Sequence, residues 1–265
     1  MPRLAVLGFP VSHSRSPAMQ NAALAALGLG GEWSYEAIEV SPEDFEHRVR
    51  EMAEGGEFAG ANVTVPHKEA ALALADAPSE VAAQIGAANT LAFPDGRIEA
   101  DNTDAGGLLG ALPGSPAGRR ALVLGAGGAA RAVVWALAGK GATVGVWNRT
   151  RHRAEELCAE LGGNPVLQPD QGSYELIVNT SAAGLGGENP FEHLPLFRGG
   201  FRPGQTVVDM VYGDRPSQLL EVALASGAET VDGLEILARQ GALSLAIWTG
   251  CEAPLDVMRA AARAN

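Results

Sequence analysis

Three polar clusters interrupt the apolar first half of the sequence, and their side chains have the chemistry of a small-molecule site. The clusters cover residues 8–17, residues 60–68, and residues 86–90 with 101–104. They combine hydroxyl and amide groups with the Lys68 ammonium and the Asp104 carboxylate. Two of the clusters directly follow predicted strands, so they could face the same crevice. Such a set suits a small polyhydroxylated acid better than an apolar ligand.

Each of these polar side chains also has a purely structural interpretation. Ser16 could be a helix cap, and Asn62 could serve a turn. Lys68 stands in a predicted first helical turn, where a solvated side chain is common, and Asp104 could be a capping acid near a helix start. A loop histidine such as His67 more often belongs to the surface or to packing than to catalysis. The residue types alone therefore leave both interpretations open.

A glycine turn in the second half predicts a dinucleotide site. Residues 125–130 read Gly-Ala-Gly-Gly-Ala-Ala, between a predicted strand at 121–124 and a predicted helix at 129–138. In this context the first glycine permits the tight turn, the second lets the backbone approach a pyrophosphate, and the small third residue lets helix and strand pack closely. Backbone N–H groups at the helix start can then bind the anion. The alternative is a turn that merely joins strand to helix.

The residues after the next predicted strand favour NADP(H) over NAD. An NAD site usually carries Asp or Glu there to accept hydrogen bonds from the ribose 2′-hydroxyl. This chain has Asn148, Arg149 and Thr150, followed by Arg151 and Arg153. Without a carboxylate a 2′-phosphate would not be repelled, and guanidinium groups could pair with it. The alternative, a solvated helix start, is less favourable because cations there oppose the helix dipole.

The alternation of short apolar runs with helical segments predicts an α/β fold with a parallel sheet in each half. In the first half, strands are expected at 4–8, 35–40, 61–65, 90–93 and 97–100, the last two forming a hairpin. In the second half, strands are expected at 121–124, 142–147, 176–179 and 206–209, and two apolar helices at 234–248 and 254–264. Ser16 is expected to cap the first helix.

Composition excludes several classes of partner. The chain of 265 residues has 19 Lys and Arg against 31 Asp and Glu, a net charge of −12. A phosphate backbone or an anionic membrane surface would be repelled, so neither nucleic acid nor membrane is an expected partner. The only two cysteines, Cys158 and Cys251, are far apart and form no disulfide framework or metal clamp, which fits a cytoplasmic protein. We expect no metal site, because no ligand cluster is evident.

The sequence resembles the shikimate dehydrogenase family essentially from end to end. The resemblance rests on a series of motifs in the family's order, at residues 8–21, 62–68, 86–90, 102–104, 125–129, 148–150, 209–212 and 233–248. It implies an N-terminal α/β substrate domain and a Rossmann-type doubly wound NADP-binding domain, with a cleft between them. The substrate domain would cover 1–102 plus 238–265, and the NADP domain 103–237. One departure is Ile236, where many members have methionine.

The resemblance also implies an activity: NADPH-dependent, reversible reduction of 3-dehydroshikimate to shikimate in aromatic amino acid (chorismate) biosynthesis. Lys68 and Asp104 would be the catalytic pair, with the lysine as general acid and base. The predicted substrate contacts are Ser14, Ser16, Asn62, Thr64, Asn89, Tyr212 and Gln240. The predicted NADP contacts are Gly125, Ala126, Gly127, Gly128, Ala129, Asn148, Arg149, Thr150, Arg153, Met210 and Gly233. The expected assembly is a monomer or a homodimer.

Two further functions remain compatible with the sequence. One is a quinate/shikimate dehydrogenase of broader use, which oxidation assays with quinate and NAD would distinguish. The other is a non-catalytic NADP-binding sensor or scaffold, which would bind NADPH tightly without turnover. The fold alone cannot choose among these functions, because function depends on the site residues. The presence of both Lys68 and Asp104 argues against the sensor.

Overall fold

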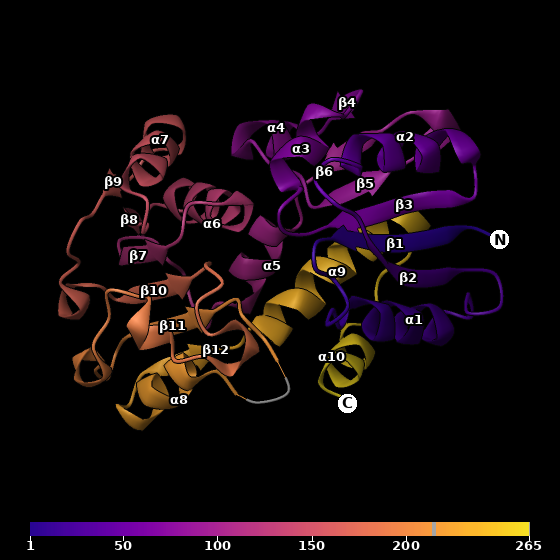
Figure 1. Cartoon of the computed structure of the whole chain (residues 1–265). Coiled ribbons are helices and arrows are strands. Elements are labelled where there is room, and N and C mark those ends of the chain that lie inside the picture. Colours follow the sequence, from indigo (N-terminus) through magenta and orange to yellow (C-terminus); the bar gives the residue numbers. More distant parts are fainter. Residues whose placement is uncertain (214–215, 265) are drawn as a thin grey trace. The chain divides into compact units, whose positions relative to one another are not determined.

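The computed structural model (Figure 1) describes residues 1–213 and 216–264 and divides into two compact units. The first unit contains Met1–Gly107 and the chain from Leu237 onward, and the second unit is Leu108–Ile236. Both divisions fall inside helices, α5 (Asp104–Ala111) and α9 (Gly233–Thr249). The domain boundaries expected from the sequence, after residues 102 and 237, remain a prediction.

The first unit has a six-stranded sheet in the order β2-β1-β3-β5-β6-β4. Its strands are β1 (Arg3–Gly8), β2 (Ser34–Glu39), β3 (Phe58–Val63), β4 (Ala77–Pro78), β5 (Thr90–Ala92) and β6 (Glu99–Asp101). The strands β2, β1 and β3 are parallel, whereas β5 pairs antiparallel with both β3 and β6. The prediction of a parallel sheet in this half therefore holds for β2, β1 and β3 and for the β4–β6 pair, but not for β5. The predicted hairpin itself makes the sheet mixed, because strands joined by a short turn must run in opposite directions.

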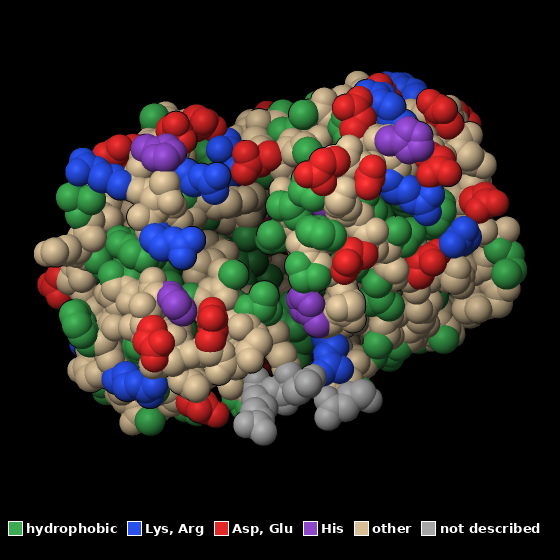
Figure 2. Space-filling model, viewed as in Figure 1, with side chains coloured by type: hydrophobic (Ala, Val, Ile, Leu, Met, Phe, Trp, Pro, Cys, Tyr) green, Lys and Arg blue, Asp and Glu red, His purple; other side chains and the backbone are tan. Residues whose placement is uncertain are grey.

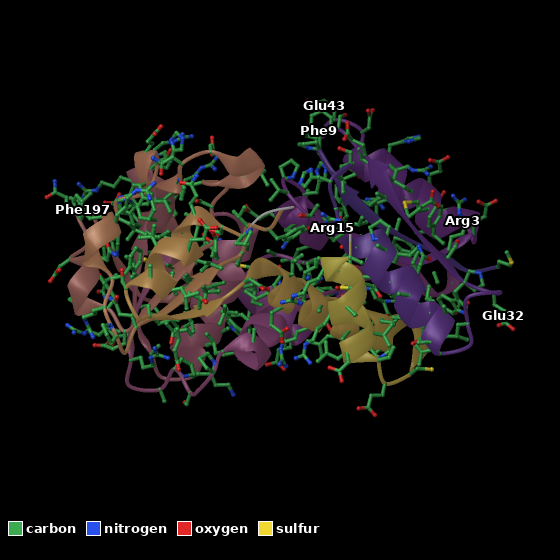
Figure 3. The ribbon with its side chains drawn as sticks, turned by 90° about the horizontal axis from the view of Figure 1, so that it is seen from below. Arg3, Phe9, Arg15, Glu32, Glu43 and Phe197 are labelled. Carbon is green, nitrogen blue, oxygen red and sulfur yellow. The ribbon has the colours of Figure 1, made fainter. Side chains whose placement is uncertain are left out.

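Helices cover this first sheet. The helices that lie wholly or partly in this unit are α1 (Ser16–Ala26), α2 (Phe45–Gly55), α3 (Lys68–Ala73), α4 (Glu80–Ile85), α5, α9 and α10 (Leu255–Arg263). The helices α1 and α10 lie side by side (Figure 3). Arg15 Nη1 donates a hydrogen bond to the Ala264 carbonyl at 3.2 Å. The prediction that Ser16 caps α1 was wrong, because the N-cap is Arg15 and Ser16 is the first helical residue. Ser14 Oγ instead accepts the Ser16 N–H at 3.2 Å.

Two glycines allow close packing against α9. A Cβ atom on Gly60 of β3 would lie 2.2 Å from Trp248 Nε1, which donates to the Leu91 carbonyl at 2.8 Å. A Cβ atom on Gly107 of α5 would lie 3.0 Å from the backbone nitrogen of Gln240. These two contacts hold α9 against the sheet and against α5, and they place Gln240 beside the start of α5.

The second unit has a six-stranded, fully parallel sheet in the order β12-β11-β10-β7-β8-β9. Its strands are β7 (Arg120–Leu124), β8 (Thr143–Trp147), β9 (Asn164–Pro165), β10 (Leu176–Asn179), β11 (Thr206–Asp209) and β12 (Glu229–Val231). Numbered from β7, this order is the 3-2-1-4-5-6 arrangement of a Rossmann fold, with its switch point between β7 and β10. The predicted doubly wound domain is confirmed.

Hydrophobic cores lie on both faces of this second sheet. Along β7, Ala121 and Val123 belong to one core and Leu122 and Leu124 to the other. Successive residues of a strand point to opposite faces, so an unbroken apolar run fills both cores. The helices are α6 (Gly128–Gly139), α7 (Arg151–Leu161) and α8 (Gln218–Ala225). Short 3₁₀ turns occur at Pro94–Gly96, Gln171–Ser173, Leu185–Gly187, Pro190–Glu192 and Arg198–Gly200.

The surface carries mixed charge. Acidic and basic side chains are interspersed on the face seen in Figure 2, without a continuous basic stripe there. In the part of the chain that the structure describes, no helix is long and apolar enough to cross a membrane. Within residues 1–213 and 216–264, no group of three or more His, Cys, Asp or Glu side chains is arranged to hold a metal ion.

Candidate active site

Lys68 and Asp104 form a nearly buried ion pair in the first unit. Lys68 Nζ lies 2.5 Å from Asp104 Oδ2, and the two side chains are 11% and 6% exposed. Lys68 is the first residue of α3 and Asp104 the first of α5. The α5 dipole favours the Asp104 carboxylate, whereas Lys68 gains nothing from its own helix start. The carboxylate therefore stabilises an ammonium group that burial and the helix dipole would otherwise disfavour.

Asn89 holds the second oxygen of the Asp104 carboxylate. Asn89 Nδ2 donates to Asp104 Oδ1 at 2.9 Å, and Asn89 Oδ1 accepts the backbone N–H of Thr103 at 2.8 Å. Because the Thr103 N–H can only donate, the oxygen end of the Asn89 amide must face it and the nitrogen end must face Asp104. Both Asp104 oxygens thus have a defined donor, which fixes the orientation of the carboxylate.

Local hydrogen bonds bring the three elements of this site together. Asn102 Oδ1 accepts the Asp104 N–H at 3.1 Å, and Asn102 Nδ2 donates to the Ala87 carbonyl at 2.8 Å. The Ala88 N–H donates to the Lys68 carbonyl at 2.8 Å. The starts of α3 and α5 are therefore tied to the residues that precede β5. These contacts bring together Lys68 and Asp104, the two residues that the resemblance implied as a pair.

Ser14, Ser16 and Thr64 lie beyond the carboxyl ends of β1 and β3, which are adjacent parallel strands. Ser16 is 4% exposed, while Ser14 and Thr64 are partly buried. The Thr64 N–H donates to the Leu7 carbonyl at 2.8 Å, so the two loops start at the same sheet edge. The Thr64 carbonyl accepts the His67 N–H at 2.9 Å, which connects this loop to the residue before Lys68.

Gln240, from α9, reaches the same group of side chains. Its Oε1 accepts a hydrogen bond from Asn89 Nδ2 at 3.1 Å, and its Nε2 donates to the Leu237 carbonyl at 2.9 Å. Gln240 is 7% exposed. The structure thus brings together Lys68, Asp104, Asn89 and Gln240, four residues predicted from the sequence for one site.

The amide of Asn62 is engaged inside the protein. Asn62 is 5% exposed, its Oδ1 accepts the Tyr35 hydroxyl at 2.8 Å, and its Nδ2 donates to Ser244 Oγ at 2.9 Å. Sequence reasoning missed Tyr35 and Ser244. Tyr35 lies within a predicted strand and Ser244 within a predicted apolar helix, and neither belongs to a polar cluster. The available signal for Ser244 was its spacing of four residues from Gln240, which puts both on one face of α9.

His67 belongs to the packing. It is 2% exposed, its ring stacks on Phe45 with centroids 4.3 Å apart, and its Nε2 is 2.8 Å from the Val40 carbonyl. Desolvation by burial lowers the pKa of His67 below its ordinary value, and the contact with the Val40 carbonyl partly opposes this. The packing interpretation of this histidine is confirmed.

In the second unit, the glycine turn has room for a ligand beside α6. A Cβ atom on Gly125 (φ 122°) would lie 2.5 Å from Thr180 Oγ1, so the first glycine is required by a close approach. Gly127, the N-cap of α6, is exposed, and a Cβ atom there would meet nothing within 4 Å. A glycine N-cap has no side chain to satisfy the first N–H groups of the helix. They remain available to an anion.

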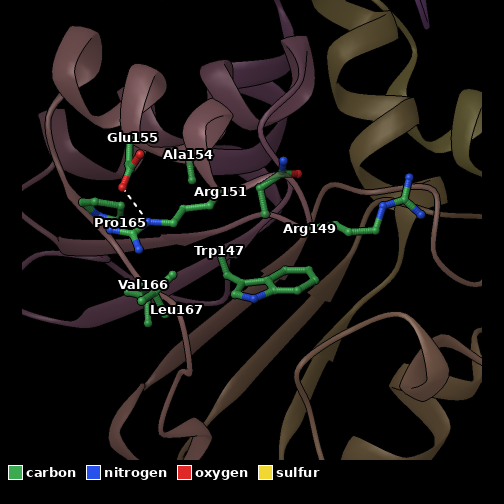
Figure 4. A pocket seen from close by; sticks show the side chains of 9 residues that line it. Trp147, Arg149, Arg151, Ala154, Glu155, Pro165, Val166 and Leu167 are labelled. Atoms are coloured by element: carbon green, nitrogen blue, oxygen red, sulfur yellow. Dashed lines mark hydrogen bonds and ion pairs between the residues drawn. The ribbon is translucent and has the colours of Figure 1, made fainter.

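A cavity of about 300 Å³ lies beyond the end of β8 (Figure 4). Its lining includes Trp147, Asn148, Arg149, Arg151 and Glu155. Arg151 Nε pairs with Glu155 Oε1 at 2.6 Å, and Arg149 extends to the other side of the Trp147 ring. The structure therefore brings Arg149 and Arg151 to this cavity, whereas the predicted contacts Thr150 and Arg153 are exposed on α7 or its N-cap and do not line it.

The remaining predicted contacts follow β11 and begin α9. A Cβ atom on Gly233 would lie 2.7 Å from the Met210 carbonyl oxygen, so the glycine permits a backbone contact. Met210 and Tyr212 are partly buried, and Asp209 before them is fully buried. Burial raises the pKa of Asp209, opposed by hydrogen bonds to its carboxylate that include one from Asn179 Nδ2 at 2.9 Å.

Comparison with known proteins gives the family. The profile of the shikimate dehydrogenase substrate binding domain matches residues 6–91, that of shikimate / quinate 5-dehydrogenase matches 111–175, and that of the shikimate 5′-dehydrogenase C-terminal domain matches 233–263. A shikimate dehydrogenase (NADP(+)) from Moorella thermoacetica is 42% identical, covering 96% of this chain and 90% of its own. Its counterpart from Methanocella arvoryzae is 43% identical and covers 97% of both chains.

Solved structures agree with this relationship. Shikimate 5-dehydrogenase from Thermus thermophilus, in complex with NADP(H) and shikimate, superimposes with a TM-score of 0.89 at 43% identity and covers 99% of both chains. Shikimate dehydrogenase from Aquifex aeolicus gives a TM-score of 0.92 at 36% identity, covering 100% of this chain and 98% of its own. Fold, site and sequence identity lead to one conclusion: the chain belongs to the shikimate dehydrogenase family.

Proposed function

We propose that this protein catalyses the NADP-dependent, reversible reduction of 3-dehydroshikimate to shikimate, a step of aromatic amino acid biosynthesis. The observation that carries the proposal is the nearly buried Lys68–Asp104 ion pair, whose carboxylate is oriented by Asn89. The relatives support the substrate and the cofactor, because curated members at 42–43% identity are NADP-dependent shikimate dehydrogenases. The T. thermophilus structure holds NADP(H) and shikimate.

The substrate would be held by hydroxyl and amide groups. The Ser14 and Ser16 hydroxyls, in the loop after β1, would bind its carboxylate. Thr64, Asn89 and Gln240 would contact its hydroxyl groups, and Tyr212 stays a predicted contact from the second unit. Asn62 was also predicted to contact substrate, but its amide already has partners within the protein. The amide of Asn89 is engaged in the same way, so Asn62 stays a predicted contact with the others.

The residues of the second unit fit NADP. The open face at Gly127 and the uncapped start of α6 can hold a pyrophosphate, together with Gly125, Ala126, Gly128 and Ala129. The cationic lining of the cavity at Arg149 and Arg151 suits a 2′-phosphate. Asn148, Thr150, Arg153, Met210 and Gly233 complete the predicted set. When bound, reduced nicotinamide would supply a hydride to the carbonyl carbon of the substrate.

The chain's own contribution is a proton and a positive charge. Lys68 Nζ would donate a proton to the substrate oxygen that becomes the hydroxyl, and its charge would stabilise negative charge on that oxygen beforehand. In the oxidation direction the neutral amine would take the proton back. Asp104 Oδ2 holds the amine at 2.5 Å and so limits the directions in which it can point. The scarcity of water around two side chains that are 11% and 6% exposed strengthens these interactions.

The test uses the only two lysines of the chain, Lys68 and Lys140. Lys68→Ala should lower kcat for NADPH-dependent reduction of 3-dehydroshikimate by a factor on the order of 10²–10⁴, since it removes a general acid and a charge. Lys140→Ala, an exposed control at the C-cap of α6, should keep the parent's kcat. NADPH absorbance follows the reaction. A near-normal kcat for Lys68→Ala would remove this residue from its proposed role.

A broader activity on quinate or with NAD is the second candidate. One family profile that matches residues 111–175 is described as shikimate / quinate 5-dehydrogenase, and a Listeria monocytogenes shikimate 5-dehydrogenase with shikimate and NAD bound is 28% identical. The arginines at the cavity argue for NADP, because a 2′-phosphate is what their charge would recognise. Oxidation rates with shikimate and quinate, each with NADP⁺ and NAD⁺, discriminate the two activities.

We further infer that the protein works in the cytoplasm as a monomer or homodimer, with domains at 1–102 plus 238–265 and 103–237. Its free cysteines, Cys158 and Cys251, support the compartment, because reducing conditions keep thiols free. Light scattering at assay concentration determines whether one or two copies assemble.

A further inference from the structure

Ser244 has more hydrogen-bond partners than a serine inside a helix needs. It is 0% exposed in α9, and its Oγ donates to the Gln240 carbonyl at 3.0 Å. That bond alone would satisfy a buried helical hydroxyl. Ser244 Oγ also lies 2.9 Å from Asn62 Nδ2, 2.8 Å from Thr90 Oγ1 and 3.1 Å from Thr103 Oγ1. One hydroxyl therefore links α9 to β3, β5 and the residue before α5.

The direction of these bonds follows from the donors available. A hydroxyl has one proton and two lone pairs, and the Ser244 proton goes to the Gln240 carbonyl. Its other partners must then donate to it. Asn62 Nδ2 is an obligatory donor, held in that orientation because Asn62 Oδ1 accepts the Tyr35 hydroxyl. The second lone pair of Ser244 Oγ is left for a threonine hydroxyl.

The same threonines contact the amide that orients the ion pair. Thr90 Oγ1 and Thr103 Oγ1 each lie 3.1 Å from Asn89 Oδ1. The other end of that amide, Asn89 Nδ2, donates to Asp104 Oδ1 at 2.9 Å. Asn89 Nδ2 also donates to Thr103 Oγ1 at 2.9 Å. The Thr103 hydroxyl can then donate to Thr90 Oγ1 at 3.3 Å, and the Thr90 hydroxyl to Ser244 Oγ at 2.8 Å, with one proton used per hydroxyl. A continuous chain of hydrogen bonds thus runs from Ser244 through the two threonines to Asn89 Nδ2, the nitrogen that also donates to Asp104.

We propose that Ser244 is a positioning residue for the reaction under Proposed function, on which this inference rests. By accepting the Thr90 hydroxyl proton, it keeps the Thr90 oxygen available to Thr103 and the Thr103 oxygen available to Asn89 Nδ2, and so supports the orientation in which that nitrogen faces Asp104. Asp104 in turn holds the Lys68 amine. Ser244 touches neither reacting atom nor cofactor in this role, and acts only through Asn89.

Removal of the Ser244 hydroxyl should loosen this cluster without unfolding the unit. Asn62 Nδ2 would keep the Asn89 carbonyl at 3.1 Å and Thr90 Oγ1 at 3.2 Å, both longer than its bond to Ser244. The threonine hydroxyls would be free to turn toward Asn62 or Asn89. Buried polar networks of this kind are sensitive to the loss of one member, because the remaining groups have no water to replace it.

The first experiment compares Ser244→Ala with Ser226→Ala. Ser226, the C-cap of α8, donates to the Val222 carbonyl at 2.9 Å in the same four-residue pattern, but in the second unit. We expect kcat/KM for 3-dehydroshikimate to fall between about 10-fold and 100-fold in Ser244→Ala, because small misplacements of reacting groups have large effects on rate. The KM for NADPH should stay within about twofold, and Ser226→Ala should match the parent. A kcat/KM of Ser244→Ala within twofold of the parent's value overturns the proposal. An equal rise in the KM for 3-dehydroshikimate and the KM for NADPH overturns it as well.

Thr90→Val provides a coupling measurement. If Ser244 acts through the threonines, the double variant Ser244→Ala/Thr90→Val should lose less than the product of the two single losses in kcat/KM, because groups that act as a unit are not additive. Independent losses that simply multiply contradict the proposed chain of contacts. If Ser244→Ala does not fold, Ser244→Cys decides, since a thiol keeps the volume but bonds weakly. The kcat/KM of Ser244→Cys should lie between the parent's value and the value expected for the Ala variant. A kcat/KM equal to the parent's would overturn the proposal.

A readout without turnover separates this inference from the proposed function. The Asn89 side-chain amide protons, followed by NMR in ¹⁵N-labelled protein, should exchange with solvent about tenfold faster in Ser244→Ala than in the parent, because the buried cluster opens more often. They should be unchanged in Ser226→Ala. A parent that turns over no 3-dehydroshikimate contradicts the proposed function. Unchanged exchange in Ser244→Ala contradicts the positioning role, whatever the activity.

Discussion

At the scale of single residues, the site depends on one buried charge and its partner. A buried ion pair adds little net stability compared with well-packed apolar residues, but removal of one partner typically costs about 3–5 kcal/mol. Lys68 and Asp104 are 11% and 6% exposed, so they belong to this class. The pair is therefore better explained by the chemistry that a held amine can perform than by a contribution to folding.

His67, the residue before Lys68, makes stability depend on pH. Burial lowers its pKa below the ordinary value of 6.5, so the unfolded chain takes up a proton at a higher pH than the folded chain. The contribution of neutral His67 is therefore fully present above about pH 6.5 and is lost as the pH falls through the window below that value. We expect urea unfolding of the parent to show this loss between pH 7 and pH 5.

His67→Phe keeps an aromatic ring against Phe45 and should flatten that dependence, although the contact with the Val40 carbonyl is lost. His13→Phe is the control, because His13 is exposed. If the free energy of unfolding of His67→Phe depends on pH as steeply as that of the parent, the pH dependence belongs to another group.

At the scale of elements, the contact between α5 and α9 brings Asp104 and Gln240 to one place. The two helices are in close contact at Gly107, where an added Cβ would lie 2.8 Å from Gln240 Cβ and 3.2 Å from its Cα. The backbone of α9 cannot yield as the end of a flexible side chain can. Gly107 thus determines how closely the two functional helices can pack.

Gly107→Ala should destabilise the protein and disturb the site. The expected cost of overpacking is about 1–3 kcal/mol, reduced by up to about 1 kcal/mol of improved helix propensity. Gly106→Ala is the matched control, because its Cβ would meet only Leu243 Cδ1, the tip of a side chain that is 44% exposed. Thermal unfolding and KM for 3-dehydroshikimate measure both effects. If Gly107→Ala and Gly106→Ala have the same Tm and the same KM for 3-dehydroshikimate, the α5–α9 contact at Gly107 is not tight.

At the scale of the whole molecule, the two predicted sites are associated with two sheets of different kind, one mixed and one parallel. The mixed sheet of the first unit positions Lys68, Asp104, Asn89 and Gln240, and the Rossmann sheet of the second unit presents the glycine turn and the cavity at Arg149. Anything that binds the folded chain and not the unfolded chain raises its stability. Each ligand should therefore be visible as a shift of the unfolding transition.

NADP⁺ at 100 times its Kd should stabilise the chain by about 2.7 kcal/mol. At the same concentration NAD⁺ should raise Tm less, because it lacks the 2′-phosphate that Arg149 would pair with. Arg149→Ala should reduce the difference between the two nucleotides, while Arg50→Ala, whose side chain pairs with Glu46 on α2, should keep it. An unchanged difference in Arg149→Ala would refute the assignment of this arginine to the phosphate.

Local patterns were sufficient to predict the glycine turn and four of the six strands of the second sheet, but not β9 and β12. The apolar run 121–124, the glycines and the next strand lie within about thirty residues, so their spacing encodes one βαβ unit. The two cores then follow from the preference of parallel sheets for burial on both faces, whereas the doubly wound arrangement was implied only by the resemblance to the family. Lys68, Asp104 and Asn89 stand in polar clusters that are conspicuous in an apolar sequence, but their roles were predicted only from the resemblance to the family.

Only the tertiary structure decided which distant segments meet. Ser244 is 182 residues from Asn62 and appears in sequence as one serine in an apolar helix. Its role depends on the packing of α9 against β3 and β5, which no local spacing encodes. The antiparallel pair in the first sheet follows from the hairpin that the sequence did predict, whereas the Arg15 cap of α1 was mispredicted because a serine before a proline allows several local solutions. The burial of the whole chain selects one of them.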